Sequence, residues 1–219
     1  MSRSATTAPL DPAAAAPDGL PVLSLGAHRD ARAGSCVMEY VSVLAGERFS
    51  DRPCCTHPAV AALAWQVNDA ATHDVRQELV LRAPALIGAG VDAGTEVRPI
   101  VLAAIVRAGL ALDPDHRFFR RLERRLARLA HDTRPSAAPP GASGSPGDRR
   151  PGRLATLLHV GPVNHACAHL MVAARAVGLD DAGRSRLAVA LLDDCLAAVR
   201  ALPADTSPGA GVTAPALLR

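Results

Sequence analysis

The residues best suited to chemistry are gathered in one stretch, GSCVMEYVSVLAGERFSDRPCCTHP, which covers residues 34–58. It combines three of the five cysteines with a glutamate inside an apolar run. If this run is helical, Cys36 and Glu39 are three positions apart and share a face, so a carboxylate lies beside a thiol. Burying a carboxylate is costly unless it is paired, hydrogen-bonded, protonated or bound to a metal. Glu39 is therefore expected to be buried and to have a partner.

A metal ion is one candidate for that partner. Thiolate, imidazole and carboxylate groups are common ligands of zinc and iron. Cys36, Glu39, Cys55 and His57 could supply four ligands, although their spacing matches no standard zinc motif. The sequence thus permits a zinc or iron site here.

A second possible metal site lies in VNHACAHLM. His165 and His169 are four residues apart, so on a helix their imidazoles share one face and could reach the same ion. The glutamate of H-E-x-x-H is absent, which excludes a zincin. If this helix packed on the first one, both histidines could join Cys36 and Glu39.

A simpler interpretation needs no metal. Cys36 is then a small core residue, Glu39 pairs with one of the many arginines, and His57 only caps a helix. A third interpretation is a reactive thiol, which would need Cys36 or Cys55 beside a basic histidine. The sequence favours the simpler interpretation.

Three further acids lie around the turn and the end of the next helix: Glu47, Asp51 and Asp69. Together with Cys36 and Glu39 they are the candidates for lining a ligand pocket, and with Glu39 they could bind a hard cation. A residue such as Asp51, close before a proline in a turn, more often hydrogen-bonds the local backbone.

The segment RFFRRLERRLARLAHD predicts a strongly basic helix. Its apolar stripe is Phe118, Leu122, Leu126 and Leu129, and six arginines cover the opposite face. Such a face could follow phosphates, but it has no interleaved aromatics for stacking on bases. Sequence-specific binding of nucleic acid is therefore not expected.

Helical patterns account for most of the chain, and no window alternates with period two. We expect an all-α single-domain bundle of about seven helices. The expected helices cover residues 35–46, 58–69, 72–88 with a bend near Pro84, 95–112, 113–132, 153–178 with a break at Gly161-Pro162, and 181–202.

Composition distinguishes three segments outside the expected helices. Residues 1–30 predict a disordered leader, 133–152 a disordered linker rich in proline, glycine and serine, and 203–219 a flexible tail. The helical core then has a first part, 31–132, and a second part, 153–202.

The overall composition excludes some classes of protein. The net charge of +3 is too small to indicate a polyanion partner by itself, and no stretch is apolar enough to cross a membrane. Five cysteines, an odd number, and the lack of an apolar signal segment predict a cytoplasmic protein with free thiols.

The pattern G-x-C-x-M-E, A-G-E-x-x-S-D-x-P, C-T-H-P and V-N-D, which covers about residues 34–88, resembles a family of uncharacterised helical proteins from actinobacteria. The matching residues are Gly34, Cys36, Met38, Glu39, Ala45, Gly46, Glu47, Ser50, Asp51, Pro53, Cys55, Thr56, His57, Pro58, Val67, Asn68 and Asp69. The resemblance implies no activity. It implies that any site uses Cys36 and Cys55, with Cys54 outside the pattern.

Two functional hypotheses follow. The first is a helical protein whose buried Cys36 and Glu39 form a polar pocket for a small ligand or metal. The alternative is a helical protein-interaction or regulatory module without catalytic activity, with a protein partner or a second copy of itself. The sequence indicates no particular substrate or reaction.

Overall fold

The computed structural model describes residues 21–93, 96–132 and 153–202. Within these residues the chain is helical, with one isolated parallel bridge between Leu23 and Ser35 and no strand, which confirms the all-α prediction. The elements are η1 (Ala31–Ala33), α1 (Val37–Leu44), α2 (Pro58–Ala70), α3 (His73–Glu78), η2 (Leu79–Arg82), α4 (Ala83–Leu86), α5 (Val97–Leu112), α6 (Arg117–Asp132), α7 (Arg153–Ala176) and α8 (Asp181–Arg200).

The short elements α3, η2 and α4 follow one another without a gap and form one bent helical unit. Pro84 lies in the first turn of α4, where its missing N–H removes no helical hydrogen bond. The expected bend near Pro84 is therefore confirmed. Counted in this way, the described part of the chain has seven helical units, as expected from the sequence.

Helix α2 lies at the centre of the bundle. It is rich in alanine, and Ala59, Ala61, Ala62 and Ala64 are all buried. Small side chains let neighbouring helices approach closely, because the distance between helix axes depends on the residues at the contact. Helix α2 accordingly packs on α1, α5, α7 and α8.

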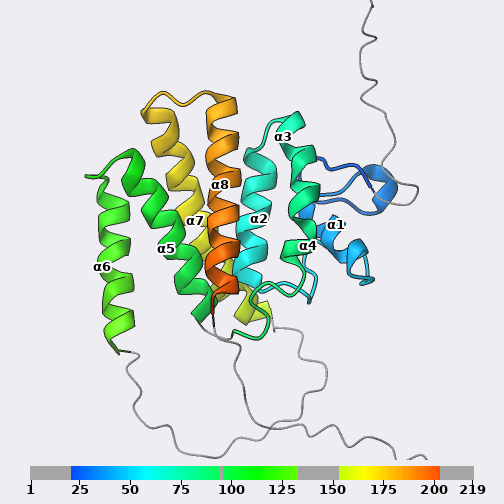
Figure 1. The fold of residues 1–219 in the computed structure, drawn as a ribbon, viewed down its shortest axis with the longest axis horizontal. Helices are drawn as coiled ribbons and strands as arrows, with labels where there is room; N and C mark the ends of the chain where they lie inside the picture. Colours follow the sequence, from blue (N-terminus) through cyan, green and yellow to red (C-terminus); the bar gives the residue numbers. More distant parts are fainter. Residues whose placement is uncertain (1–20, 94–95, 133–152, 203–219) are drawn as a thin grey trace, which may run out of the picture.

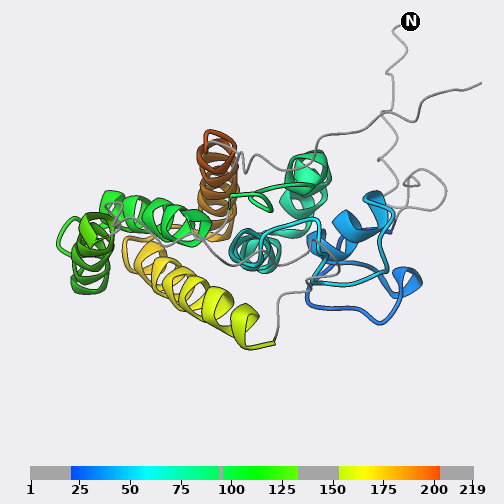
Figure 2. The same cartoon turned by 90° about the horizontal axis from the view of Figure 1, so that it is seen from below.

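Helices α7 and α8 lie on opposite faces of the α2–α5 pair (Figures 1 and 2). Both pack extensively on α2 and α5 and touch each other little. Helix α6 lies at one edge of the molecule, against α5, while α1 lies toward the opposite edge (Figure 1). Fully buried Leu63, Ile105, Leu170 and Leu192 join the central helices into one core.

The expected break at Gly161-Pro162 is wrong, because α7 runs continuously from Arg153 to Ala176 with Pro162 inside it. A proline removes one helical hydrogen bond, and the burial of Val163, Ala166 and Leu170 against the core keeps the helix intact beyond it. Among the described residues no helix, α7 included, is both long and apolar enough to cross a bilayer.

The prediction that packing begins only after residue 30 is also wrong. Leu23 is 1% exposed and belongs to the core, and the chain beside it pairs with Ser35. The run PVLSLG at residues 21–26 is apolar enough to bury, unlike the alanine and proline that precede it. The rest of the expected leader, the linker 133–152 and the tail 203–219 lie outside the described residues.

Candidate functional site

Glu39 is the centre of a buried polar network at the start of α1. Its side chain is almost completely buried, with 1% of the residue exposed. One carboxylate oxygen, Oε1, accepts the backbone N–H of His28 at 2.7 Å. The other, Oε2, accepts the N–H of Cys36 at 2.7 Å and lies 2.9 Å from Nδ1 of His28. The prediction of a buried, paired Glu39 is confirmed, but the partner is a histidine and not an arginine.

Cys36 is the N-cap of α1 and forms a capping box with Glu39. Its Sγ accepts the N–H of Glu39 at 3.4 Å, while the Glu39 carboxylate accepts the N–H of Cys36. Burial raises the pKa of the Cys36 thiol to about 12, and the nearby Glu39 charge acts in the same direction. Because nucleophilic cysteines need a lowered pKa, this environment disfavours a reactive thiol at Cys36.

His28 connects this network to the N-terminal segment. Its Nε2 lies 2.8 Å from Oγ of Ser24, on the opposite side of the ring from Glu39. Sequence reasoning missed His28, because it was assigned to the leader. The apolar run before it was the one signal that could have placed the segment against the core.

Asn68 and Asp69 tie the same segment to the end of α2. Asn68 Oδ1 accepts the N–H of Val37 at 3.1 Å, and Asn68 Nδ2 donates to the carbonyl of Ser24 at 3.0 Å. The Asp69 carboxylate accepts the N–H of Gly26 at 3.2 Å. The V-N-D part of the motif therefore holds α1, α2 and residues 24–26 together.

The turn after α1 holds a separate group of side chains. Glu47 accepts hydrogen bonds from the backbone N–H of Cys54 at 2.9 Å and from its thiol at 3.1 Å. Burial would raise the pKa of Glu47, but these bonds and those from Cys55 lower it overall. Burial raises the pKa of Cys55, with partial compensation from Thr56. Asp51 contributes its backbone carbonyl, which accepts the indole N–H of Trp65 at 2.9 Å.

His57 caps α2, as the simpler interpretation predicts. Its Nδ1 accepts the N–H of Ala59 at 3.1 Å, and its ring meets that of His159 edge-on at 5.0 Å between centroids. Burial lowers the pKa of His57 to about 4, and the neighbouring His159 and Arg98 add to the shift. His57 is therefore neutral at pH 7.

The four residues considered for zinc or iron lie in different surroundings. Cys36 and Glu39 bond to each other, Cys55 lies beside Glu47 and Thr56, and His57 faces His159. In the part of the chain that the structure describes, no three His, Cys, Asp or Glu side chains are grouped to hold a metal ion. The structure thus assembles no four-ligand site from this set.

His165 and His169 do share a face of α7, with ring centroids 4.8 Å apart. Their neighbours come from the α5–α6 turn and the start of α6. Phe118 stacks on His169 at 3.8 Å, and His116 meets His169 at 6.1 Å. Both α7 histidines contact α6 in this way, and Cys36 and Glu39 are not among their ring contacts.

An open cleft of about 600 Å³ lies between the α2–α3 corner and the adjoining parts of α7 and α8. One wall carries Asp69 and Arg76, and the other carries Met171, Val172 and Arg175. Of the five residues expected to line a ligand pocket, Asp69 borders this cleft, and Cys36, Glu39, Glu47 and Asp51 do not. The volume is within the range of small-molecule sites.

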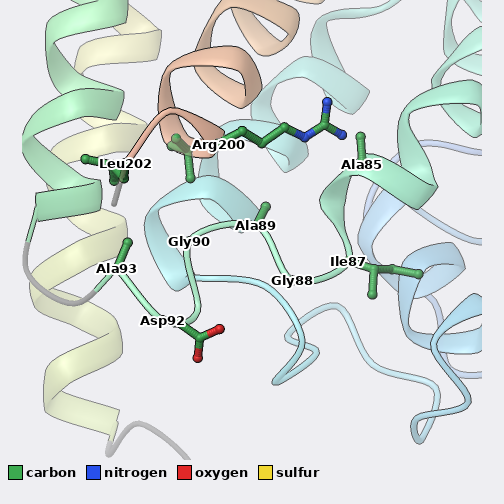
Figure 3. Close-up of a pocket in the computed structure, with 10 residues that line it drawn as sticks. Ala85, Ile87, Gly88, Ala89, Gly90, Asp92, Ala93, Arg200 and Leu202 are labelled. Atoms are coloured by element: carbon green, nitrogen blue, oxygen red, sulfur yellow. The ribbon is translucent and has the colours of Figure 1, made fainter. Parts of the chain in front are cut away.

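A smaller hollow of about 230 Å³ lies between residues 85–93 and the end of α8 (Figure 3). Its lining is mostly small and apolar, and its two charged residues, Asp92 and Arg200, point away from each other (Figure 3). It therefore offers no converging polar groups, and the larger cleft is the better candidate.

Arg76 is the feature that distinguishes the larger cleft. It is 6% exposed, and its guanidinium donates to the carbonyls of Asn68 at 2.9 Å and Ala71 at 2.6 Å. Among the described residues no carboxylate forms an ion pair with it. A buried cation usually has an anionic partner, because desolvation penalises an uncompensated charge. Sequence reasoning missed Arg76, since the cleft joins helices far apart in the chain.

Comparisons with family models, with curated proteins and with solved structures give no match for this chain. The resemblance to the actinobacterial family stays a prediction.

Proposed function

We propose that this protein is a non-catalytic binding protein that takes up an organic anion with an apolar body in the cleft between α2–α3 and α7–α8. The observation that carries the proposal is Arg76, a buried guanidinium at the cleft whose bonds go to backbone carbonyls. A ligand carboxylate or phosphate would provide the missing negative charge, and Arg guanidinium groups are suited to both.

The other residues of the cleft fit an amphipathic ligand. Arg175 adds a second, exposed cation, while Leu25 and Val172 are 59% and 58% exposed at the rim. Arg184 is already engaged by the carbonyl of Leu179 and by Asp181. The anionic end of a ligand would thus lie toward Arg76 and Arg175, with its apolar part on Leu25, Met171 and Val172.

The buried polar network around Glu39 supports this function indirectly. The chain of contacts from Glu39 through His28 and Ser24 reaches Asn68, whose own carbonyl accepts from Arg76. The buried network therefore holds the α2 wall of the cleft in place. In this proposal Cys36 and Glu39 shape the site from behind and do not contact the ligand.

The test uses decanoate as an amphipathic anion and acetate as a matched anion without the apolar chain. In ¹H–¹⁵N NMR spectra, decanoate is expected to shift amides of residues 66–76 and 168–184, and acetate is not. Arg175→Glu should weaken the decanoate response at least tenfold, because it reverses a charge at the cleft. Arg186→Glu, an exposed change elsewhere on α8, is the matched control and should leave it unchanged.

The proposal would be contradicted if decanoate shifted mainly amides outside the cleft. It would also be contradicted if Arg175→Glu and Arg186→Glu changed the response to decanoate equally. The alternative, a protein-interaction module, is favoured by the exposed Leu25 and Val172 at the same rim. It would gain support if decanoate gave no response at all. All five cysteines are free thiols, which supports placing this function in a reducing cytoplasm.

A further inference from the structure

Helix α6 carries six of the 24 basic residues of the protein, all on one face. Its exposed arginines are Arg117, Arg120, Arg121, Arg124, Arg125 and Arg128. The acidic residues of α6 are Glu123 and Asp132, so the net charge of the helix is +4 when its histidine is neutral. The net charge of the whole chain is +3. The residues outside α6 therefore carry a net charge of −1 together. The arginine face is therefore a local concentration of positive charge that the rest of the chain does not share.

The geometry of the helix places these side chains together. At 100° per residue the six arginines fall within an arc of about 140°, opposite the apolar stripe. Arg117, Arg121, Arg124 and Arg128 form a row about 17 Å long, given a rise of 1.5 Å per residue. Of these six arginines, Arg120 alone forms an ion pair with another described residue, the highly exposed Asp115 at 3.2 Å.

This arrangement works against the stability of the helix. Arg117 and Arg121, Arg120 and Arg124, Arg121 and Arg125, and Arg124 and Arg128 are like-charged pairs at i,i+4, each destabilising by about 0.2–0.5 kcal/mol. The first turn contains arginine and no acid, which opposes the helix dipole. Features that break local stability rules are expected where function requires them.

The helix is nevertheless firmly anchored. Phe119 is fully buried, and its ring fills the space beside Gly109 on α5. Phe118 stacks on His169 of α7 at 3.8 Å. Phe118, Leu122 and Leu126 of the apolar stripe thus pack against the core, while Leu129 is 44% exposed. Helix α6 forms a ridge at the edge of the molecule (Figures 1 and 2), and its six arginines are exposed to solvent.

We propose that the arginine face of α6 binds the phosphate backbone of double-stranded nucleic acid without reading its sequence. A row of about 17 Å spans about five phosphates of one strand at 3.4 Å each along the duplex axis. The contacts are from guanidinium groups to phosphates, so they carry affinity and no sequence information.

Other polyanions fit this face less well. Single strands are held by aromatic side chains that stack on bases, and both phenylalanines of α6 are engaged in packing. Amphipathic helices bind membranes by burying their apolar face in lipid, but the apolar face of α6 packs on α5. A flat lipid surface would also meet only the crest of the ridge. The surface differs from the proposed ligand cleft, so each proposal can fail without the other.

The experiment measures fluorescence anisotropy of two labelled 20-base-pair DNA duplexes of unrelated sequence, titrated with the full chain at several salt concentrations. The test variant is Arg121→Ala/Arg124→Ala. The control variant, Arg186→Ala/Arg200→Ala, removes the same charge from exposed positions on α8. Vesicles with 30% phosphatidylserine and a single strand of equal length are the competing ligands.

The two duplexes are expected to bind with affinities that agree within about twofold. The logarithm of the binding constant should fall with the logarithm of the salt concentration at a slope of roughly −4 to −5. The α6 variant should bind at least tenfold more weakly with a slope smaller by about 2, and the α8 variant should bind like the wild type. Thermal unfolding of the α6 variant at or above the wild-type temperature would show that weaker binding is not caused by misfolding.

Several results would overturn the proposal. They are no duplex binding at 50 mM salt, equal loss in the α6 and α8 variants, a clear preference for one sequence, or binding to vesicles or single strands tighter than to duplex.

Discussion

At the scale of single residues, the most informative group is the carboxylate of Glu39. It accepts three hydrogen bonds in a site with almost no access to water. Every donor belongs to His28 or Cys36. The carboxylate therefore holds the two ends of the segment 28–36 close together. A polar group of this kind specifies one conformation of the chain more than it contributes to net stability.

Removing this carboxylate leaves buried donors without an acceptor. Glu39→Ala is therefore expected to lower the free energy of unfolding by about 1–3 kcal/mol, and Glu39→Gln by less, because its amide oxygen still accepts one N–H. Urea denaturation followed by circular dichroism measures the difference. Glu123→Ala, at an exposed position on α6, is the control and should change stability by less than about 0.5 kcal/mol. Equal, small effects of Glu39→Ala and Glu123→Ala would contradict this account of the network.

At the scale of elements, the packing of α5 on α6 depends on one glycine. A Cβ at Gly109 would come within van der Waals overlap of the buried Phe119 ring. A Cβ at Gly161 on α7 would instead lie in open space. These two helical glycines thus separate the effect of packing from the effect of helix propensity.

Replacing each glycine by alanine should have opposite effects. Gly161→Ala is expected to stabilise by about 0.5–1 kcal/mol, since alanine loses less backbone entropy in a helix. Gly109→Ala is expected to destabilise by about 1–3 kcal/mol, because overpacking outweighs the gain in propensity. Thermal unfolding of the two variants beside the wild type checks both signs. A stabilising Gly109→Ala would mean that Phe119 is free to move away from α5.

Helix positions are the part of the fold that the sequence predicted well. Apolar periodicity and caps such as Pro58 after His57 are local signals, and they located each helical unit. The failures have physical causes. The continuity of α7 through Pro162 depends on tertiary packing, which local propensity does not contain. The cleft beside Arg76 joins residues about a hundred positions apart, and only the three-dimensional structure brings them together.

At the scale of the whole molecule, the pH dependence of stability should reflect His57. Its folded-state pKa of about 4 is below the ordinary value of 6.5, so the folded protein prefers the neutral ring. The contribution of the neutral His57 ring to stability is then fully present above about pH 6.5. It is lost as the pH decreases toward 4, because the unfolded chain binds the proton at a higher pH than the folded chain. The loss is at most about 1.4 kcal/mol per pH unit in this window.

The variant His57→Asn tests this contribution, because asparagine also caps helices but does not titrate. Urea denaturation at pH 7, 6 and 5 should give a flatter stability profile for the variant than for the wild type. Some slope remains, since burial and Arg98 also lower the pKa of His159. Identical profiles would show that His57 does not remain neutral in the folded protein.

The placement of α7 and α8 on opposite faces of the α2–α5 pair also bears on how the protein is made in the cell. The alanine-rich face of α2 receives α8 only after the 110 residues between Ala70 and Asp181 have been synthesised. At roughly 5–20 residues per second, that interval is on the order of 5–20 s on the ribosome. During this time the nascent chain exposes apolar surface that its own sequence cannot yet cover. The order of the helices therefore leaves this face of α2 uncovered during much of translation.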